Sequence, residues 1–187
     1  MNIADIPGAW LTILAAVQTI HPEAILAGGA LRDLDNGRPV KDLDIFIDAG
    51  RVSVGALSVL LGIDPTTVHV QGCDFSSCLN ESDCQFSDTF SCLGWEVNVI
   101  GLADMPVTLA SVTERVDFGI CQIGTDGVEV RKTLAYHNDK AFRRFTVCRQ
   151  QSVDETDRSL RRWDRISAKY PGWTLVRPAL PTTEDFI

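Results

Sequence analysis

Apolar residues recur along this chain with two spacings, which together predict a series of strands and helices. Four apolar residues between 5 and 20 are three or four positions apart, the spacing of one helical face. They are Trp10, Ile13, Leu14 and Val17. Short runs that are apolar at almost every position predict buried strands. The strands expected in this way are 23–27, 41–48, 67–70, 95–102, 117–124 and 128–131, and the further helices are 31–35, 53–62, 138–150 and 154–169.

The order of these elements predicts the fold class. Strands dominate the first two thirds of the chain and helices dominate the last third, which favours an α+β fold. We expect a mixed sheet with helices packed on one face, followed by a helical segment at the C-terminus. The expected division is a head domain over residues 1–135 and a helical, basic appendage over residues 136–187. A polar stretch rich in Ser and Cys, residues 72–94, predicts a long surface insertion within the head domain.

Four of the six cysteines lie in this insertion, namely Cys73, Cys78, Cys84 and Cys92. The gaps between them are four, five and seven residues, without the closely paired spacing of structural zinc sites. Free thiols are the favoured interpretation. A zinc site and a disulfide are the alternatives.

Composition and charge narrow the class of protein. With 45% hydrophobic and 22% charged residues among 187, the chain has the composition of a soluble globular protein, and we expect it in the cytoplasm. Residues 1–130 contain 18 acidic and 5 basic side chains, whereas residues 131–187 contain 7 acidic and 12 basic ones. An acidic body with a basic tail suits a protein that binds metal ions in one place and phosphates in another. A solvated helical face is the alternative explanation of the basic tail.

Asp42 and Asp44 stand out because they lie one residue apart within an apolar, strand-like run. Side chains at positions i and i+2 of a strand point to the same face, so the two carboxylates project together. Two like charges so placed repel each other unless a cation compensates them. Mg²⁺ is usually bound by one or two carboxylates together with substrate phosphates. The pair therefore predicts a site for Mg²⁺, with Mn²⁺ as the alternative ion.

Gly28 and Gly29 supply a complementary feature, because they separate a predicted strand from a short helical turn. Without Cβ atoms, the backbone N–H groups of such a turn can approach a ligand closely. The N-terminus of the following helical turn attracts negative charge. The diglycine turn therefore predicts a phosphate contact near the aspartate pair, and a simple turn is the alternative.

Three motifs occur in the order in which the polymerase β-like nucleotidyltransferases have them. They are Gly28-Gly29-Ala30-Leu31-Arg32-Asp33, Lys41-Asp42-Leu43-Asp44 and Arg115-Val116-Asp117-Phe118-Gly119-Ile120. Over residues 23 to about 130 the chain resembles the head domain of poly(A) polymerases and CCA-adding enzymes. It also looks similar to small phage-encoded nucleotidyltransferase-like proteins, through Cys121-Gln122 and the segment leading to Lys169-Tyr170. A phage origin would place the protein in the host cytoplasm.

This resemblance implies catalytic and phosphate-binding roles for the first two motifs. Asp42 and Asp44 would hold the catalytic metals, and Gly28 and Gly29 would cradle the phosphates of a nucleoside triphosphate, with Arg32 nearby. The reaction would transfer a nucleoside monophosphate to a hydroxyl of an RNA, a protein or a small molecule.

Further roles follow for the positions around these motifs. The resemblance implies that Asp33 braces the diglycine loop and that Arg115 and Asp117 frame the nucleotide. Glu96 is our candidate for a third catalytic carboxylate, because its strand is expected beside the aspartate pair. Asn98 occupies the same face of that strand and is the alternative neighbour of the metal.

Two departures from the family keep a second interpretation open. Cys121 stands where the family often has Asn, and the chain ends about 50 residues after the sheet, without the domains that hold tRNA. A non-catalytic module that binds nucleotide or a partner, such as a phage-type regulator or inhibitor, is therefore the alternative function.

The predicted C-terminal helix contains four arginines at spacings of three and four, which are Arg158, Arg161, Arg162 and Arg165. This spacing predicts one basic stripe. We expect the stripe to contact phosphates of the acceptor or of the triphosphate, with Leu160 and Ile166 on the opposite side of the helix. Ion pairs with Asp154, Asp157 and Asp164 are the alternative.

Overall fold

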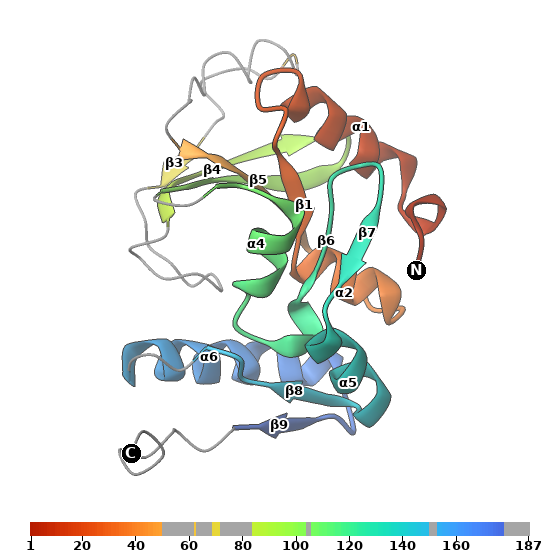
Figure 1. Ribbon diagram of the computed structural model, residues 1–187, viewed down its shortest axis with the longest axis vertical. Coiled ribbons are helices and arrows are strands. Elements are labelled where there is room, and N and C mark those ends of the chain that lie inside the picture. The colour runs from red at the N-terminus through yellow and green to blue at the C-terminus, as the bar shows by residue number, and fades with distance from the viewer. Residues whose placement is uncertain (50–61, 63–68, 72–83, 104–105, 150–152, 178–187) are drawn as a thin grey trace.

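The structure is a computed structural model that describes residues 1–49, 62, 69–71, 84–103, 106–149 and 153–177. Its helices are η1 (Ile3–Asp5), α1 (Gly8–Gln18), α2 (Gly29–Asp35), α4 (Leu109–Glu114), η4 (Gly119–Cys121), α5 (Leu134–Phe142), α6 (Val153–Ile166) and η5 (Ser167–Lys169). Its strands are β1 (Ile25–Ala27), β2 (Asp42–Asp48), β3 (His69–Gln71), β4 (Cys84–Cys92), β5 (Trp95–Leu102), β6 (Ile123–Thr125), β7 (Val130–Lys132), β8 (Arg144–Thr146) and β9 (Thr174–Val176). Figure 1 shows the main sheet above α6, β8 and β9.

The main sheet has seven strands in the order β3-β4-β5-β2-β1-β6-β7. Strands β2 and β5 pair in parallel, and the other neighbours are antiparallel. The predicted α+β class with a mixed sheet is therefore confirmed. The parallel pair lies at the middle of the sheet, and this is where the aspartate pair is located.

The alternation of side chains along β2 separates two faces of the sheet. Leu43, Ile45 and Ile47 are buried in one hydrophobic cluster together with the apolar stripe of α1. On the other face, Phe46 is buried with Val112 of α4 in a second cluster. Asp42 and Asp44 share the face of Phe46 but lie nearer the start of the strand. The sheet therefore presents the two carboxylates beyond the edge of an apolar cluster.

The structure corrects several predicted elements. Residues 84–92 were expected within the surface insertion, but they form β4, which pairs with β5 along nearly its whole length. The predicted strand 117–124 is η4 followed by β6, and the predicted hairpin with the next strand is formed by β6 and β7. The predicted helix 53–62 lies outside the described residues except for Gly62. Cys73 and Cys78 also lie outside them, and Cys92, Cys121 and Cys148 are free thiols.

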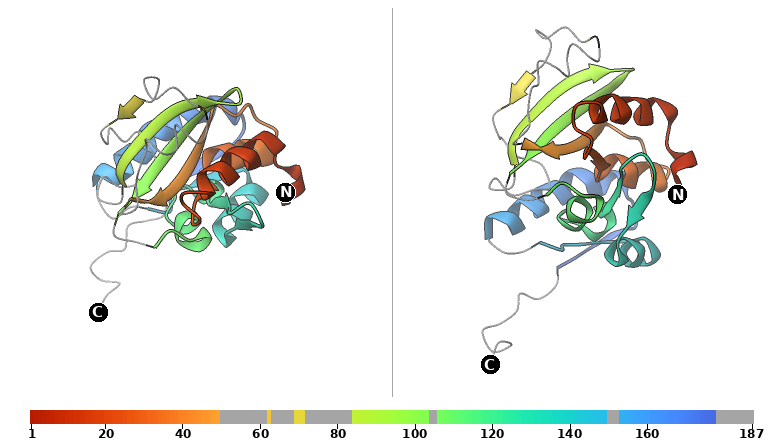
Figure 2. Two further views of the ribbon diagram at one scale, coloured as in Figure 1. Left: turned by 90° about the horizontal axis from the view of Figure 1, so that it is seen from above. Right: turned by 45° about the horizontal axis from the view of Figure 1, so that its top comes forward.

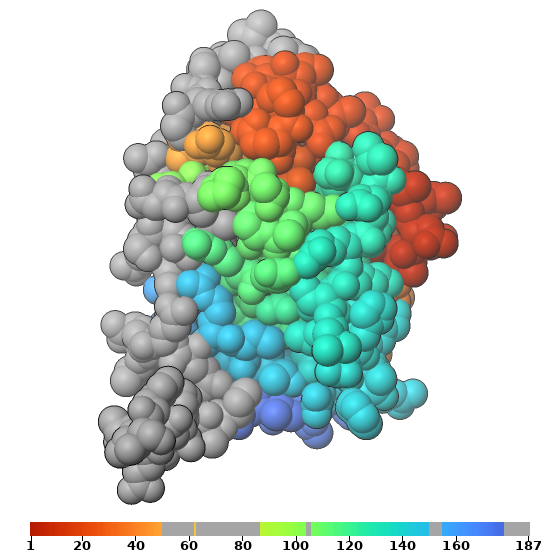
Figure 3. Space-filling view, viewed as in Figure 1, coloured from red at the N-terminus to blue at the C-terminus, as the bar shows by residue number. Residues whose placement is uncertain are grey.

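The C-terminal segment packs against the rest of the chain through aromatic rings. Phe145 of β8 contacts Phe118, Trp163, Tyr170 and Trp173, with ring centroids 5.0 to 5.7 Å apart. Both views of Figure 2 show α6 beneath the main sheet. In Figure 3 the described part of the C-terminal segment (blue) lies along the lower part of the molecule, next to teal residues of the preceding segment. The predicted domain boundary at residue 135 falls inside α5 and stays a prediction.

None of the helices in the described part of the chain is both long and apolar enough to cross a bilayer.

Candidate active site

The parallel pairing of β2 and β5 determines which side chains stand beside the two aspartates. Asp42 is opposite Glu96 and Asp44 is opposite Asn98. The Asn98 amide Nδ2 donates to Asp44 Oδ1 over 2.9 Å, and Thr89 Oγ1 donates to Asn98 Oδ1 over 2.8 Å. Asn98 is therefore the direct neighbour of Asp44, held in place by a hydrogen bond on each side.

The two aspartates are in different surroundings. Burial raises the pKa of Asp44, and the negative charge of Asp42 raises it further. Asp42 Oδ2 accepts from Lys41 Nζ over 3.0 Å. The site thus holds an incompletely compensated carboxylate pair, which a bound cation would stabilise.

Glu96, the predicted third carboxylate, lies at the outer end of the same face. Its side chain is 48% exposed, and its Oε1 is 3.4 Å from Lys41 Nζ. Lys41 therefore bridges Asp42 and Glu96. The catalytic role predicted for Glu96 stays a prediction.

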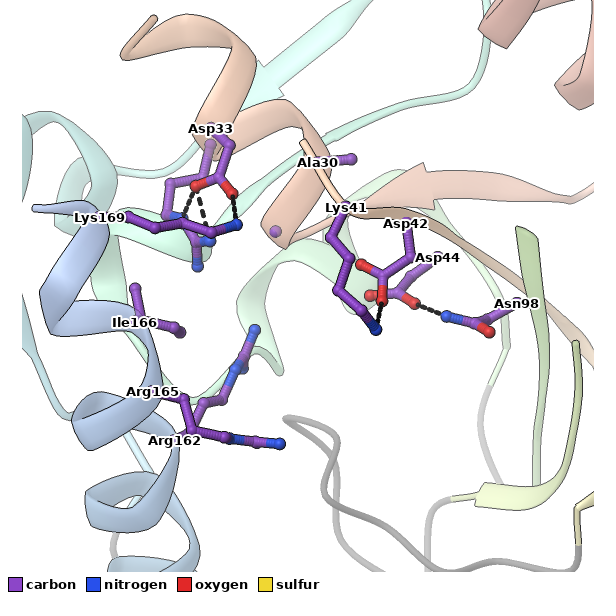
Figure 4. Close-up of a pocket in the computed structure, with 12 residues that line it drawn as sticks. Ala30, Asp33, Lys41, Asp42, Asp44, Asn98, Arg162, Arg165, Ile166 and Lys169 are labelled. Carbon is purple, nitrogen blue, oxygen red and sulfur yellow. Dashed lines mark hydrogen bonds and ion pairs between the residues drawn. The ribbon is translucent and has the colours of Figure 1, made fainter. Parts of the chain in front are cut away.

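The aspartates open onto a pocket of about 380 Å³. Residues from five elements and their connections line it: Gly29, Ala30, Arg32, Asp33, Lys41, Asp42, Asp44, Asn98, Arg162, Arg165, Ile166 and Lys169. Figure 4 shows Asp42, Asp44 and Asn98 on one side of the pocket, with Arg162, Arg165 and Lys169 on the C-terminal side. Five lining side chains are cationic and three are anionic, so the pocket suits an anionic ligand that arrives with a metal ion.

The diglycine turn lies at the edge of this pocket. Gly28 has φ of +85° and ψ of −128°, a conformation that only glycine adopts readily. Gly29 is the first residue of α2, and among the described residues a Cβ built there would come within 4 Å of only the Arg32 Nη2 atom, at 3.7 Å. The space beside Gly29 therefore opens toward the pocket, as the predicted phosphate contact requires.

Arg32 and Asp33 form a buried ion pair below the turn. Both Nε and Nη2 of Arg32 are 2.7 Å from Asp33 Oδ1. Asp33 also accepts from Tyr170 OH over 2.7 Å and from Lys169 Nζ over 3.0 Å. Asp33 thus connects α2 to the segment that follows α6. These contacts are compatible with the predicted bracing role of Asp33.

The third motif lies behind the C-terminal wall of the pocket. Asp117 is buried, and its Oδ1 is 2.5 Å from Arg162 Nη1. Arg115 is the C-cap of α4, and its carbonyl oxygen accepts from Arg149 Nη1 over 3.1 Å. Neither Arg115 nor Asp117 lines the pocket. Their predicted part in framing the nucleotide stays a prediction, and Asp117 positions Arg162, which does line it.

The four arginines of α6 are in unlike surroundings. Arg162 is buried and Arg165 is exposed, and both line the pocket. Arg161 is exposed and Arg158 is half-buried, and neither lines the pocket. Ile166 was expected on the side opposite the arginines, but it lines the pocket one turn from Arg162. Two of the four arginines therefore reach the pocket, and the phosphate contacts expected of the whole stripe stay a prediction.

The donor set at Asp42 and Asp44 suits a hard divalent cation. The two residues offer carboxylate oxygens on one face of β2, and the raised pKa of Asp44, caused first by burial, indicates a need for positive charge there. Mg²⁺ accepts such a pair when water and phosphate oxygens complete its coordination. No group of three or more His, Cys, Asp or Glu side chains suited to a metal occurs within the described residues. The residues present thus fit a metal that is completed by substrate.

Sequence reasoning had not assigned a role to Lys41, Lys169 or Tyr170 at this site. Lys41 directly precedes Asp42, so a contact between the two side chains could have been predicted from the sequence. Lys169 and Tyr170 reach Asp33 from 136 and 137 residues away. No local pattern could have indicated that contact.

Comparison with known proteins identifies the fold. No family model and no curated protein matches this chain. Among solved structures, a tRNA-processing enzyme in an apo form has a TM-score of 0.63 and 18% identity, over 91% of this chain and 45% of that protein. The Bacillus stearothermophilus CCA-adding enzyme in complex with CTP has a TM-score of 0.57 and 17% identity, over 90% of this chain and 40% of the enzyme.

A third structure is a tRNA nucleotidyltransferase complexed with a primer tRNA and an incoming ATP analogue. It has a TM-score of 0.56 and 18% identity, over 89% of this chain and 46% of that protein. The expected likeness to small phage-encoded proteins finds no support in these comparisons. The chain spans less than half the length of each of these three proteins, and it shares the fold of CCA-adding enzymes and tRNA nucleotidyltransferases.

Proposed function

We propose that this protein is a metal-dependent nucleotidyltransferase that transfers a nucleoside monophosphate from a nucleoside triphosphate to a hydroxyl group. The observation that carries the proposal is the pair Asp42 and Asp44 on one face of β2, opening onto a pocket whose other walls are Gly29 and basic side chains. Carboxylates for a metal and donors for phosphates therefore meet in one cavity of about 380 Å³.

Each wall of the pocket has a part in this reaction. Asp42 and Asp44 would hold a metal ion, which would supply Lewis-acid stabilisation of the charge that develops on the phosphates. The backbone N–H of Gly29 and the guanidinium of Arg32 contact the phosphate groups. Arg165 and Lys169 add positive charge from the C-terminal wall. Such charges stabilise a transition state best when they are held in place beforehand.

RNA is the acceptor that we place first, ahead of a protein or a small molecule. The similar solved structures include a tRNA nucleotidyltransferase with a primer tRNA and a Thermotoga maritima CCA-adding enzyme complexed with a tRNA. The identities are 16% and 18%, so these likenesses support the choice of acceptor without deciding it. We propose Mg²⁺ as the metal and a 3′-terminal hydroxyl as the nucleophile.

The test is nucleotide transfer by the purified chain. Each of the four α-labelled nucleoside triphosphates is incubated with Mg²⁺ and either total RNA or a tRNA that lacks its 3′ end. We expect label in RNA, and we expect none when a chelator replaces Mg²⁺. Asp42→Asn and Asp44→Asn should each lower transfer by at least about 100-fold, since an amide keeps the shape of the side chain but not its charge.

Asp48→Asn is the matched control for these two variants. Asp48 lies on the same strand and the same face but outside the pocket. Its variant should transfer as well as the parent. Equal turnover in the parent and both pocket variants would contradict the proposal.

A non-catalytic nucleotide-binding module is the second candidate. Asn98, a neutral side chain, occupies the position beside Asp44, where a third carboxylate would give a fuller metal site. A module of this kind would bind a Mg²⁺–triphosphate complex but would leave no label in RNA, protein or small molecules from a cell extract. Binding without transfer in that assay selects this function.

A further inference from the structure

Arg32 lies at the base of the pocket with all three of its nitrogens in contact with neighbours. Its side chain is 3% exposed. Nη1 donates to Cys121 Sγ over 3.0 Å, while Nε and Nη2 contact Asp33 Oδ1. The Nη2 atom is also the atom closest to a Cβ built on Gly29. The orientation of this guanidinium therefore decides what a phosphate at the diglycine turn would meet.

Arg32 and Asp33 are consecutive residues of one helix, which is an unusual arrangement for an ion pair. Side chains at positions i and i+1 point away from each other around a helix, so they do not pair without help. The hydroxyl of Tyr170 supplies a bridge between them. It donates to Asp33 Oδ1 over 2.7 Å and accepts from Arg32 Nε over 3.2 Å.

Tyr170 is itself rigidly held. It is 1% exposed, and its ring packs against Phe145 and Trp173 with centroids 5.0 Å apart in each case. The Arg32 guanidinium lies 5.5 Å from the centroid of the same ring. The preceding residue, Lys169, holds the other carboxylate oxygen of Asp33 over 3.0 Å and also donates to the carbonyl of Pro39. The segment after α6 thus fastens the Arg32–Asp33 pair from outside the helix.

We propose that Tyr170, assisted by Lys169, is a positioning residue for Arg32. It keeps the guanidinium directed at the phosphate position beside Gly29. The contribution of Tyr170 to binding rests on the function proposed above, whereas its hold on Arg32 does not. The C-terminal segment therefore has two parts in the pocket. It lines one wall, and through Tyr170 it also sets the orientation of Arg32 beside Gly29.

The experiment compares Tyr170 with Tyr136, a second buried tyrosine whose hydroxyl also binds a carboxylate of α2 but not the one paired with Arg32. Tyr136 is 0% exposed, and its hydroxyl binds Asp35, which lies on the same helix α2 but does not line the pocket. Tyr170→Phe and Tyr136→Phe each remove one buried hydroxyl that binds a carboxylate of α2. We expect similar losses of thermal stability from both variants. Only Tyr170→Phe should weaken binding of Mg²⁺–ATP or Mg²⁺–CTP, by about tenfold in calorimetry.

A second readout reports Arg32 directly and needs no nucleotide. The ¹⁵N NMR signal of the Arg32 Nε–H group is assigned by its loss in Arg32→Lys. Tyr170→Phe should shift this signal and speed its exchange with water, whereas Tyr136→Phe should leave both unchanged. If Tyr170→Phe does not fold, Lys169→Gln carries the same expectation with a smaller effect.

The two measurements distinguish a failure of the proposed function from a failure of the proposed role of Tyr170. If the parent binds no nucleotide, the proposed function fails, and the NMR comparison alone decides whether Tyr170 positions Arg32. Equal effects of the two tyrosine variants on the Arg32 signal would overturn the inference. So would an unchanged nucleotide affinity in Tyr170→Phe when the parent binds well.

Discussion

Asn98 and Asp44 face each other across the parallel strands β5 and β2, and the asparagine amide donates to the carboxylate over 2.9 Å. This contact orients Asp44 and partly offsets the burial that raises its pKa. It also puts a neutral side chain where a carboxylate would add a third negative charge to those of Asp42 and Asp44. The residue at position 98 therefore decides whether the site carries two carboxylates or three.

Asn98→Asp should make the fold depend on metal. A third carboxylate beside Asp42 and Asp44 adds repulsion, so the melting temperature in chelator should fall by about 3–6 °C, or roughly 1–2 kcal/mol. Addition of Mg²⁺ should restore most of this loss. Asn98→Ala is the control, because it removes the hydrogen bond without adding charge and should show no such recovery. Thermal unfolding followed by circular dichroism measures both effects, and equal responses of the two variants to Mg²⁺ would refute the predicted metal site.

The two glycines of the turn should respond differently to substitution. Gly28→Ala forces a Cβ onto a backbone with φ of +85° and should cost about 1–3 kcal/mol of unfolding free energy. A Cβ at Gly29 comes within 4 Å of only Arg32 among the described residues, so Gly29→Val should leave the melting temperature nearly unchanged. It should nevertheless weaken binding of Mg²⁺–triphosphate by about tenfold or more, since its side chain occupies the proposed phosphate position. Calorimetry and denaturant unfolding on the same samples separate the two effects, and wild-type affinity in Gly29→Val would remove the glycine from the site.

Arg161 and Arg165 are both exposed residues of α6, so their variants can be compared directly. Arg165 lines the pocket and Arg161 does not. Arg165→Gln should weaken triphosphate binding and lower the slope of log affinity against log salt by about one, as the loss of one phosphate contact predicts. Arg161→Gln should change neither quantity. The titrations are made at several salt concentrations, and identical slopes for the two variants would exclude Arg165 from phosphate binding.

Arg162 should behave as a structural residue. It pairs with Asp117 over 2.5 Å, and both side chains are buried. Arg162→Gln leaves a buried carboxylate without its partner and should cost about 3–5 kcal/mol of unfolding free energy. The double variant Arg162→Gln, Asp117→Asn should recover part of this loss. Additive losses in the double variant, measured by denaturant unfolding, would show that the ion pair contributes nothing.

Asp88 of β4 should make stability depend on pH. It is 1% exposed, no hydrogen-bond donor in the described part of the chain reaches either of its oxygens, and burial raises its pKa. A carboxyl group with a raised pKa in the folded state binds a proton more tightly there than in the unfolded chain. Its contribution to stability is therefore fully present below the ordinary pKa and falls as pH rises through the raised value.

Asp88→Asn should accordingly melt at a higher temperature than the parent at pH 7. The two proteins should converge as pH falls below about 4, near the ordinary pKa of an Asp side chain. Thermal unfolding between pH 3 and pH 8 measures the difference. A constant difference across this range would show that Asp88 does not titrate differently in the two states.

Much of the fold could be predicted where local chemistry determines the structure. The run 95–102 forms β5 within the same bounds, and 41–48 forms β2 with a difference of one residue at its start. The prediction failed at β4, because the stretch around it is polar and rich in Ser and Cys. Within the strand itself, Phe86 and Phe90 lie at alternate positions, which is a weak strand signal. The segment forms a strand because β5 offers it a partner along nearly its whole length. Local preference for strand is weak, and pairing with a neighbour overrides it.

The sequence by itself determined the parts of the candidate site that depend on short spacings. Asp42 and Asp44 share a face because strand side chains alternate, and Gly28 adopts its turn because it lacks a Cβ. The tertiary structure alone decided that Asn98 rather than Glu96 stands beside Asp44, because the register of β5 on β2 is set across 54 residues. It also decided that Tyr170 reaches Asp33 and that Arg162 turns inward to Asp117. Such contacts depend on which surfaces the folded chain brings together, and that is decided by the packing of the whole core rather than by any local pattern.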